Sequence, residues 1–149
     1  MSATTTKTMP AGAMLGDLVR NMYHPGYCLE SAIVIAPAGA VATPSVRLLG
    51  QPVKASGANY VLVLGGDIAN AAGVVADDNL YDLPAAGGLI GPISILRRGP
   101  AQYGAAALPA NDVLGTGITP AAFLSALSTN CNPPLIPVQP LTPTKVQTN

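Results

Sequence analysis

The stretch Ile93-Ser-Ile-Leu-Arg-Arg-Gly-Pro-Ala101 decides how this chain is predicted to fold. Its first four residues are mostly β-branched or aliphatic, and this composition favours a strand. Gly99-Pro100 then ends the run, because proline cannot donate a hydrogen bond to a neighbouring strand. Gly91-Pro92 precedes the run in the same way. We therefore predict a short strand over 93–96, framed by two turns, and a weaker strand over 101–105.

The same pattern recurs along most of the chain. Short aliphatic runs alternate with turn residues, and the 149 residues include 16 Gly and 15 Pro. Strands at this spacing, separated by such turns, are typical of a mainly β domain. The other predicted strands cover residues 30–36, 46–49, 59–64 and 72–75.

One helix is predicted near the C-terminus. Thr119 suits the N-cap, and Pro120 suits the first helical position, where its missing N–H is not needed. Phe123, Leu124 and Leu127 then fall on one face, and Asn130 ends the helix. The predicted fold class is mainly β with a short C-terminal helix (α+β), in which the helix covers one side of a compact β domain.

The two ends of the chain differ from its middle. The first 13 residues are polar and Thr-rich, and apolar residues follow at helix-like spacing until His24-Pro25-Gly26. The last 18 residues contain five prolines, so we expect an extended, polyproline-like segment. The predicted organisation is a flexible N-terminal arm over residues 1–22, a β domain over 23–131 and an extended Pro-rich tail over 132–149.

Charge and hydropathy argue against several classes of partner. Seven Lys and Arg residues balance seven Asp and Glu residues, so there is no basic surplus to bind nucleic acid. No apolar run approaches the ~20 residues of a membrane span, so no membrane partner is expected. The N-terminus lacks the pattern of a secretory signal, and we expect the protein to remain in the cytoplasm where it is made. A net charge of zero also weakens self-repulsion, which suits packing against copies of the same chain.

Side chains that perform chemistry are scarce, since charged residues make up 9% of the chain and there is one His. A catalytic site would rest on His24 and Cys28, with Glu30 nearby. The intervening Pro25-Gly26 indicates a turn and not a shared helix face. We interpret His24 as a partly exposed turn residue and predict no catalytic residue. Cys28 and Cys131 are expected to be buried free thiols, with a disulfide as the alternative.

No metal ion or other cofactor is predicted. Asp77, Asp78 and Asp82 form the densest acidic patch, but they lack the alternate spacing and the glycine of a calcium loop. A solvated loop is the favoured interpretation. Gly65-Gly66-Asp67 follows an apolar run but lacks the Lys and Ser/Thr of a phosphate loop, so we predict a hairpin or bulge turn.

Arg97 and Arg98 are the one basic pair in the chain. Neighbouring side chains of a strand point to opposite faces, so these two cannot form a flat phosphate-binding patch. Two interpretations stay open. One arginine crosses a subunit interface and pairs with an acid on a neighbour, or both are solvated at the end of a strand.

Taken in order, these segments resemble the head decoration proteins of lambda-like tailed phages. The resemblance runs over most of residues 16–136, and the order and spacing of its segments carry it. The resembling segments are Gly16-Asp17-Leu18-Val19, residues 26–35, residues 46–50, Ala72-Gly73-Val74-Val75, residues 93–101 and residues 121–127.

The resemblance implies a mostly β domain that assembles as a homotrimer on the outer surface of the virion. Such a protein is not an enzyme. It binds the major capsid protein at the three-fold and quasi-three-fold positions of the expanded head and stabilises the head against the pressure of packaged DNA. The alternative is another structural module of the virion, associated with its tail or fibres. In the family the N-terminal arm often contacts the capsid, and here that role falls on Thr4, Thr5, Thr6, Lys7, Leu15 and Leu18.

Overall fold

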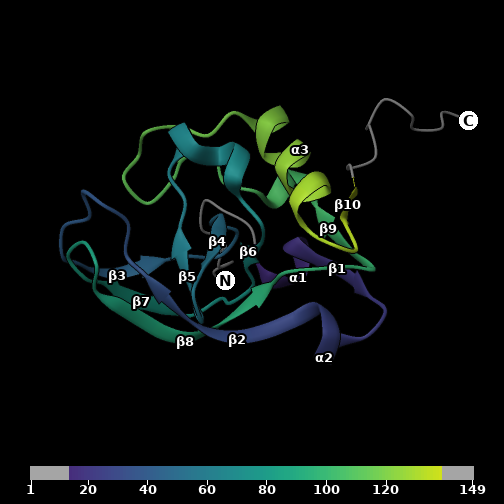
Figure 1. Cartoon of the computed structure of the whole chain (residues 1–149), viewed down its shortest axis with the longest axis horizontal. Coiled ribbons are helices and arrows are strands. Elements are labelled where there is room, and N and C mark those ends of the chain that lie inside the picture. The colour runs from purple at the N-terminus through teal and green to yellow at the C-terminus, as the bar shows by residue number, and fades with distance from the viewer. Residues whose placement is uncertain (1–13, 139–149) are drawn as a thin grey trace, which may run out of the picture.

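The structure is a computed structural model in which residues 14–138 are described. These residues are mainly β, with a short helix near the C-terminus (Figure 1). The strands form a five-stranded, a three-stranded and a two-stranded sheet. The prediction of a mainly β fold with a short helix near the C-terminus is confirmed. Thr4, Thr5, Thr6 and Lys7 of the predicted capsid contact lie outside the described residues.

The five-stranded sheet contains the two longest strands, which pair with each other antiparallel near its middle. Leu29 lies opposite Leu96, and Ile35 lies opposite Leu89. In spatial order the strands are β4 (Val53–Ser56), β5 (Asn59–Leu62), β2 (Leu29–Ile35), β8 (Leu89–Leu96) and β6 (Val74–Val75).

β8 begins earlier than predicted and continues through Gly91-Pro92. The pairing register with β2 shifts between Ala32 and Val34, so Gly91 and Pro92 together lie opposite one residue of β2 and form a β-bulge in β8. Gly91 has a φ of 111°, and a Cβ there would lie 2.8 Å from the backbone nitrogen of Ile93. The prediction that the strand begins only after a turn at Gly91-Pro92 is therefore wrong, because a bulge does not need the N–H that proline lacks.

The three-stranded sheet brings together the two ends of the described chain. Its central strand β9 (Ala101–Gly104) pairs antiparallel with β1 (Val19–Met22) and parallel with β10 (Leu135–Val138). Pro137 of β10 is tolerated because this strand lies at an edge. The start of the predicted Pro-rich tail is thus extended, as expected, but it belongs to a sheet.

The residues before β1 also belong to the folded domain and not to a separate arm. α1 (Leu15–Leu18) forms a single turn, and the Leu18 side chain is fully buried in the core. The domain therefore starts by residue 14 and not at residue 23. Leu18 cannot contact a capsid from the surface, because its apolar side chain already packs inside the domain. Leu15 packs against the same core and keeps partial exposure.

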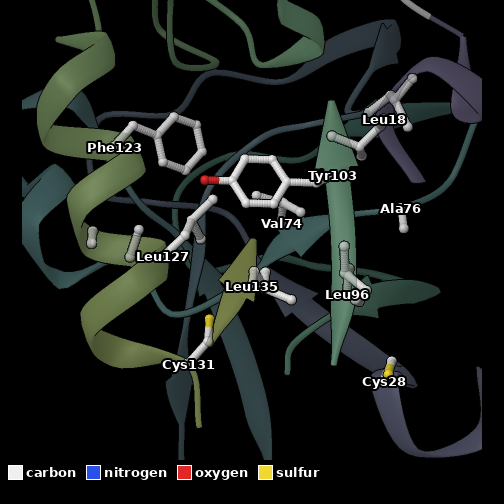
Figure 2. Packing of buried hydrophobic residues seen from close by; sticks show 14 of the residues in the cluster. Leu18, Cys28, Val74, Ala76, Leu96, Tyr103, Phe123, Leu127, Cys131 and Leu135 are labelled. Carbon is white, nitrogen blue, oxygen red and sulfur yellow. The ribbon is translucent and has the colours of Figure 1, made fainter. Parts of the chain in front are cut away.

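Two hydrophobic clusters form the core. The cluster drawn in Figure 2 is closed on one side by α3 (Pro120–Asn130), whose Phe123 and Leu127 are fully buried. Tyr103 of β9 points toward these two side chains. The other cluster, which includes Val34, consists mainly of side chains from the five-stranded sheet, together with Leu48 and Leu83 from segments outside that sheet. The helix starts and ends where the sequence predicts, although the Thr119 side chain makes no capping hydrogen bond.

Gly65-Gly66-Asp67 opens the short 3₁₀ helix η1 (Gly65–Asn70) and is neither a phosphate loop nor the predicted hairpin turn.

The buried Asp112 carboxylate accepts hydrogen bonds from the backbone nitrogens of Gly65, Leu114 and Thr116. Burial alone would raise the pKa of Asp112, but these bonds and the one from the Thr116 hydroxyl outweigh it and lower the pKa.

The remaining strands, β3 (Thr43–Arg47) and β7 (Leu80–Leu83), form the two-stranded sheet. The acidic patch beside it is engaged in local contacts. Asp78 pairs with Arg47 at 3.0 Å, and Asp77 accepts a hydrogen bond from the Tyr81 hydroxyl at 2.6 Å. The Ser45 backbone nitrogen donates to Asp82. These aspartates hold a turn and a sheet together.

The burial of Leu18 predicts that Leu18→Ala lowers the free energy of unfolding by about 2–5 kcal/mol, because it leaves a cavity in the core. Leu80→Ala removes the same atoms from a side chain that is 62% exposed, and should change stability by less than about 0.5 kcal/mol. Urea unfolding followed by circular dichroism measures both. Equal stabilities for the two variants would contradict the placement of Leu18 in the core.

Candidate interaction surface

Arg97 and Arg98 lie in the connection between β8 and β9, which we call the connector (residues 97–100). The strand ends at Leu96, so the expectation that the two side chains project from opposite faces of a strand does not apply. The Arg97 guanidinium forms an ion pair with Glu30 of the same chain. The Arg98 guanidinium carbon lies 4.1 Å from the centre of the Tyr27 ring, at cation–π distance.

Glu30 of β2 links the connector to a third strand. Its Oε1 accepts hydrogen bonds from Arg97 and, at 2.9 Å, from the Tyr60 hydroxyl of β5. Partial burial would raise the pKa of Glu30, but the two hydrogen bonds and the charges of Arg97 and Arg98 outweigh it and lower the pKa. Burial and the bond to this carboxylate raise the pKa of Tyr60 to about 12. The cluster positions the connector against the sheet, and the acid that pairs with Arg97 is internal to the chain.

Next to the connector lies an open hollow of about 520 Å³, which we call the tyrosine hollow. The one-turn helix α2 (Pro25–Cys28) positions Tyr27 on one side of it, and Tyr23 is 81% exposed. No Asp, Glu, Lys or Arg lines the hollow, and its one imidazole is that of His24. The hollow is lined by Tyr23, His24, Gly26, Tyr27 and Pro100.

A second hollow of about 370 Å³ continues from the first, since both are lined by Tyr23 and Pro100. It lies over the start of the three-stranded sheet, where Met22 is opposite Ala101. The exposed Ile136 of β10 lines it as well. The two hollows form one surface of mainly apolar character, of the kind that proteins use to contact other proteins.

The prediction that both cysteines are buried free thiols is confirmed. Cys28 and Cys131 are both buried and unbonded, and Figure 2 shows them in different parts of the core cluster. The Cys28 thiol donates to the Pro100 carbonyl at 3.5 Å. Burial raises the pKa of the Cys131 thiol to about 11, which leaves it protonated near neutral pH. Within residues 14–138, no group of three or more His, Cys, Asp or Glu could hold a metal ion.

The tyrosine hollow was not predicted from the sequence. Its aromatic side chains come from residues 23–27, whereas Pro100 comes from a distant segment, and only the pairing of β1 with β9 brings them together. One signal was available. Tyr23 and Tyr27 flank His24-Pro25-Gly26 in a chain that has only five tyrosines and one phenylalanine.

Comparisons of the chain with protein-family models, curated proteins and solved structures found no match. Across the described part of the chain, no helix has the length and apolar character needed to cross a membrane.

The Glu30 cluster predicts how Tyr60 titrates. In the unfolded chain the tyrosine ionises near pH ~10, whereas in the folded chain the pKa of Tyr60 is about 12. The folded state is therefore stabilised by the protonated Tyr60 below pH ~10, and this contribution to the free energy of unfolding is lost as the pH rises toward 12. Glu30→Gln removes the negative charge that opposes the phenolate, so the pKa of Tyr60 should fall. The ¹³C chemical shift of the Tyr60 ring, followed against pH, measures this.

Tyr103 is the matched control for this titration. Burial, followed by the charge of Cys131, raises its pKa to about 12 as well, without Glu30. Its pKa should therefore be the same in the wild type and in Glu30→Gln. A Tyr60 pKa near 10 in the wild type, or equal shifts of both tyrosines, would contradict the described cluster.

Proposed function

We propose that this protein is a non-enzymatic decoration protein of a tailed-phage head, which binds the expanded shell as a homotrimer and stabilises it. The observation that carries the proposal is the order of the segments that resemble the decoration family. They coincide with central elements of the domain: residues 26–35 supply most of α2 and all of β2, residues 93–101 join β8 to β9, and residues 121–127 lie in α3. A resemblance spread over paired elements constrains one architecture more strongly than a single motif does.

The character of the described surface supports a protein whose work is contact. The clusters of polar side chains described above bind their own chain: Glu30 holds the connector and Asp112 holds a loop. The exposed tyrosine hollow and the second hollow offer apolar area instead. Such area is suited to packing against other protein subunits.

For the capsid contact we propose the N-terminal residues, with the Thr-rich segment that includes Lys7 as its centre. An extended polar segment can add a strand to an exposed sheet edge of the capsid protein. Ordering it costs about 1–2 kcal/mol per residue, so one segment binds weakly. Three segments on one trimer gain ~10²–10⁴ in affinity by avidity, and a closed three-fold ring matches a three-fold site on the shell.

Deletion of residues 1–13 should therefore abolish or greatly weaken binding to expanded shells while the trimer persists. Co-sedimentation with expanded and unexpanded shells measures the binding, and light scattering measures the oligomeric state. Deletion of residues 144–149 from the other end of the chain is the control, which should still bind expanded shells. Full-strength binding after deletion of residues 1–13 would contradict the assignment of the contact.

The wild-type protein decides between this function and the alternative virion module. A trimer that binds expanded shells and not unexpanded ones is the expected result. A monomer that binds neither shell would overturn the proposal and favour a module associated with the phage tail or fibres.

A further inference from the structure

The prolines at the C-terminal end follow a strict rhythm. Pro134, Pro137, Pro140 and Pro143 are each separated by two other residues. A polyproline II helix has three residues per turn, so prolines at this spacing fall on one face. The first two lie among the described residues, next to or within β10. The last two belong to the final eleven residues, 139–149, which we call the terminal segment.

Aromatic hollows are the usual receptors for such a proline face. Domains that bind Pro-x-x-Pro segments do so in grooves lined by aromatic rings, because the preformed helix loses little entropy on binding. The tyrosine hollow has two tyrosines, an imidazole and Pro100 around an open space of about 520 Å³. Residues 139–143 carry no charge, and no Asp, Glu, Lys or Arg lines the hollow. The two surfaces therefore match in chemistry.

The direction of β10 decides which hollow the terminal segment can reach. β10 runs parallel to β9, with Leu135 beside Ala101 and Val138 beside Gly104. The tyrosine hollow lies at the Ala101 end, so Val138 lies about 10 Å further along the strand, and β10 points away from this hollow. To enter the hollow of its own domain, the chain would have to reverse within a segment whose prolines favour continued extension.

We propose that the terminal segment of one copy binds, through Pro140 and Pro143, in the tyrosine hollow of a second copy of this chain. At ~3.1 Å per residue, Pro140 and Pro143 can lie about 6 Å and about 16 Å beyond Val138, which reaches a domain packed against this end of β10. Each copy then donates one segment and receives another. Such a head-to-tail contact closes into a ring when it repeats around a symmetry axis. The contact needs no capsid, so it stands independently of the proposed decoration function.

The N-terminal segment is a weaker candidate for the same hollow. Residues 1–13 contain a single proline, Pro10, and so present no proline face. Their Thr-rich composition suits strand addition and not an aromatic groove.

The test places a nitroxide on the terminal segment and reads its effect at the hollow. The nitroxide is attached through a thioether to folded full-length Thr144→Cys without ¹⁵N, because Cys28 and Cys131 are buried in the folded protein and react slowly. The thioether does not exchange with these thiols when the chain is later unfolded. The nitroxide-bearing chain is unfolded and refolded together with ¹⁵N-labelled wild-type protein, so that mixed assemblies form. We expect the amide signals of Tyr23, Gly26 and Tyr27 to broaden, while that of Leu89 on β8 stays sharp.

Matched variants make the result specific. Tyr23→Ala in the ¹⁵N-labelled chain should remove the broadening, and Leu89→Ala should not; both side chains are highly exposed, so both variants should fold. In the nitroxide-bearing chain, the double variant Pro140→Ala, Pro143→Ala should also remove it. The double variant Gln139→Ala, Thr142→Ala changes a different face of the helix and should leave the broadening intact.

Three outcomes would overturn the proposal. A second sample has the nitroxide and ¹⁵N on the same chain, diluted in excess wild-type protein without either label. Broadening in this sample alone would place the terminal segment on its own domain. No broadening in either sample would show that the segment does not enter the hollow. Broadening that survives the double proline variant would show that the proline face is not what binds.

Discussion

The connector between β8 and β9 is the constraint on which the rest of this domain depends. It is four residues long, yet it contacts the segments on both sides of it. The Arg97 backbone nitrogen donates to the Cys28 carbonyl at 2.9 Å, and Tyr23 donates to the Pro100 carbonyl at 3.0 Å. Gly99 donates to the Pro133 carbonyl at 2.7 Å, next to the strand that ends the described chain. The five-stranded and three-stranded sheets are thereby held in one arrangement.

This arrangement also explains why the candidate interaction surface lies where it does. The connector brings Pro100 between β1 and α2, so that the exposed tyrosines gather around it. Arg98 covers one face of the Tyr27 ring and so restrains it. Rigid aromatic groups bind partners at a low cost in conformational entropy. The connector thus both links the two sheets and lines the candidate interaction surface.

Much of the fold followed from local patterns. Strands β2, β5 and β8 are rich in β-branched or aliphatic residues between turn signals, β9 follows directly after Gly99-Pro100, and α3 has its proline at the first position. β4 and β7 were missed because both are short and partly polar. β1 and β10 were missed because their pairing with β9 joins segments far apart in sequence, and no local pattern reports such a contact. For the same reason the internal partner of Arg97 and the tyrosine hollow could not be predicted.

The central claim, that the connector holds both ends of the described chain, is tested most directly at Gly99. A Cβ at this position would lie 2.3 Å from the Pro134 carbonyl oxygen, so either the connector or the segment before β10 must move. Gly66→Ala is the control, because nothing lies within 4 Å of a Cβ there. In urea unfolding we expect Gly99→Ala to lose about 1–3 kcal/mol and Gly66→Ala to lose less than about 0.5 kcal/mol. Equal stability of the two variants would contradict the account.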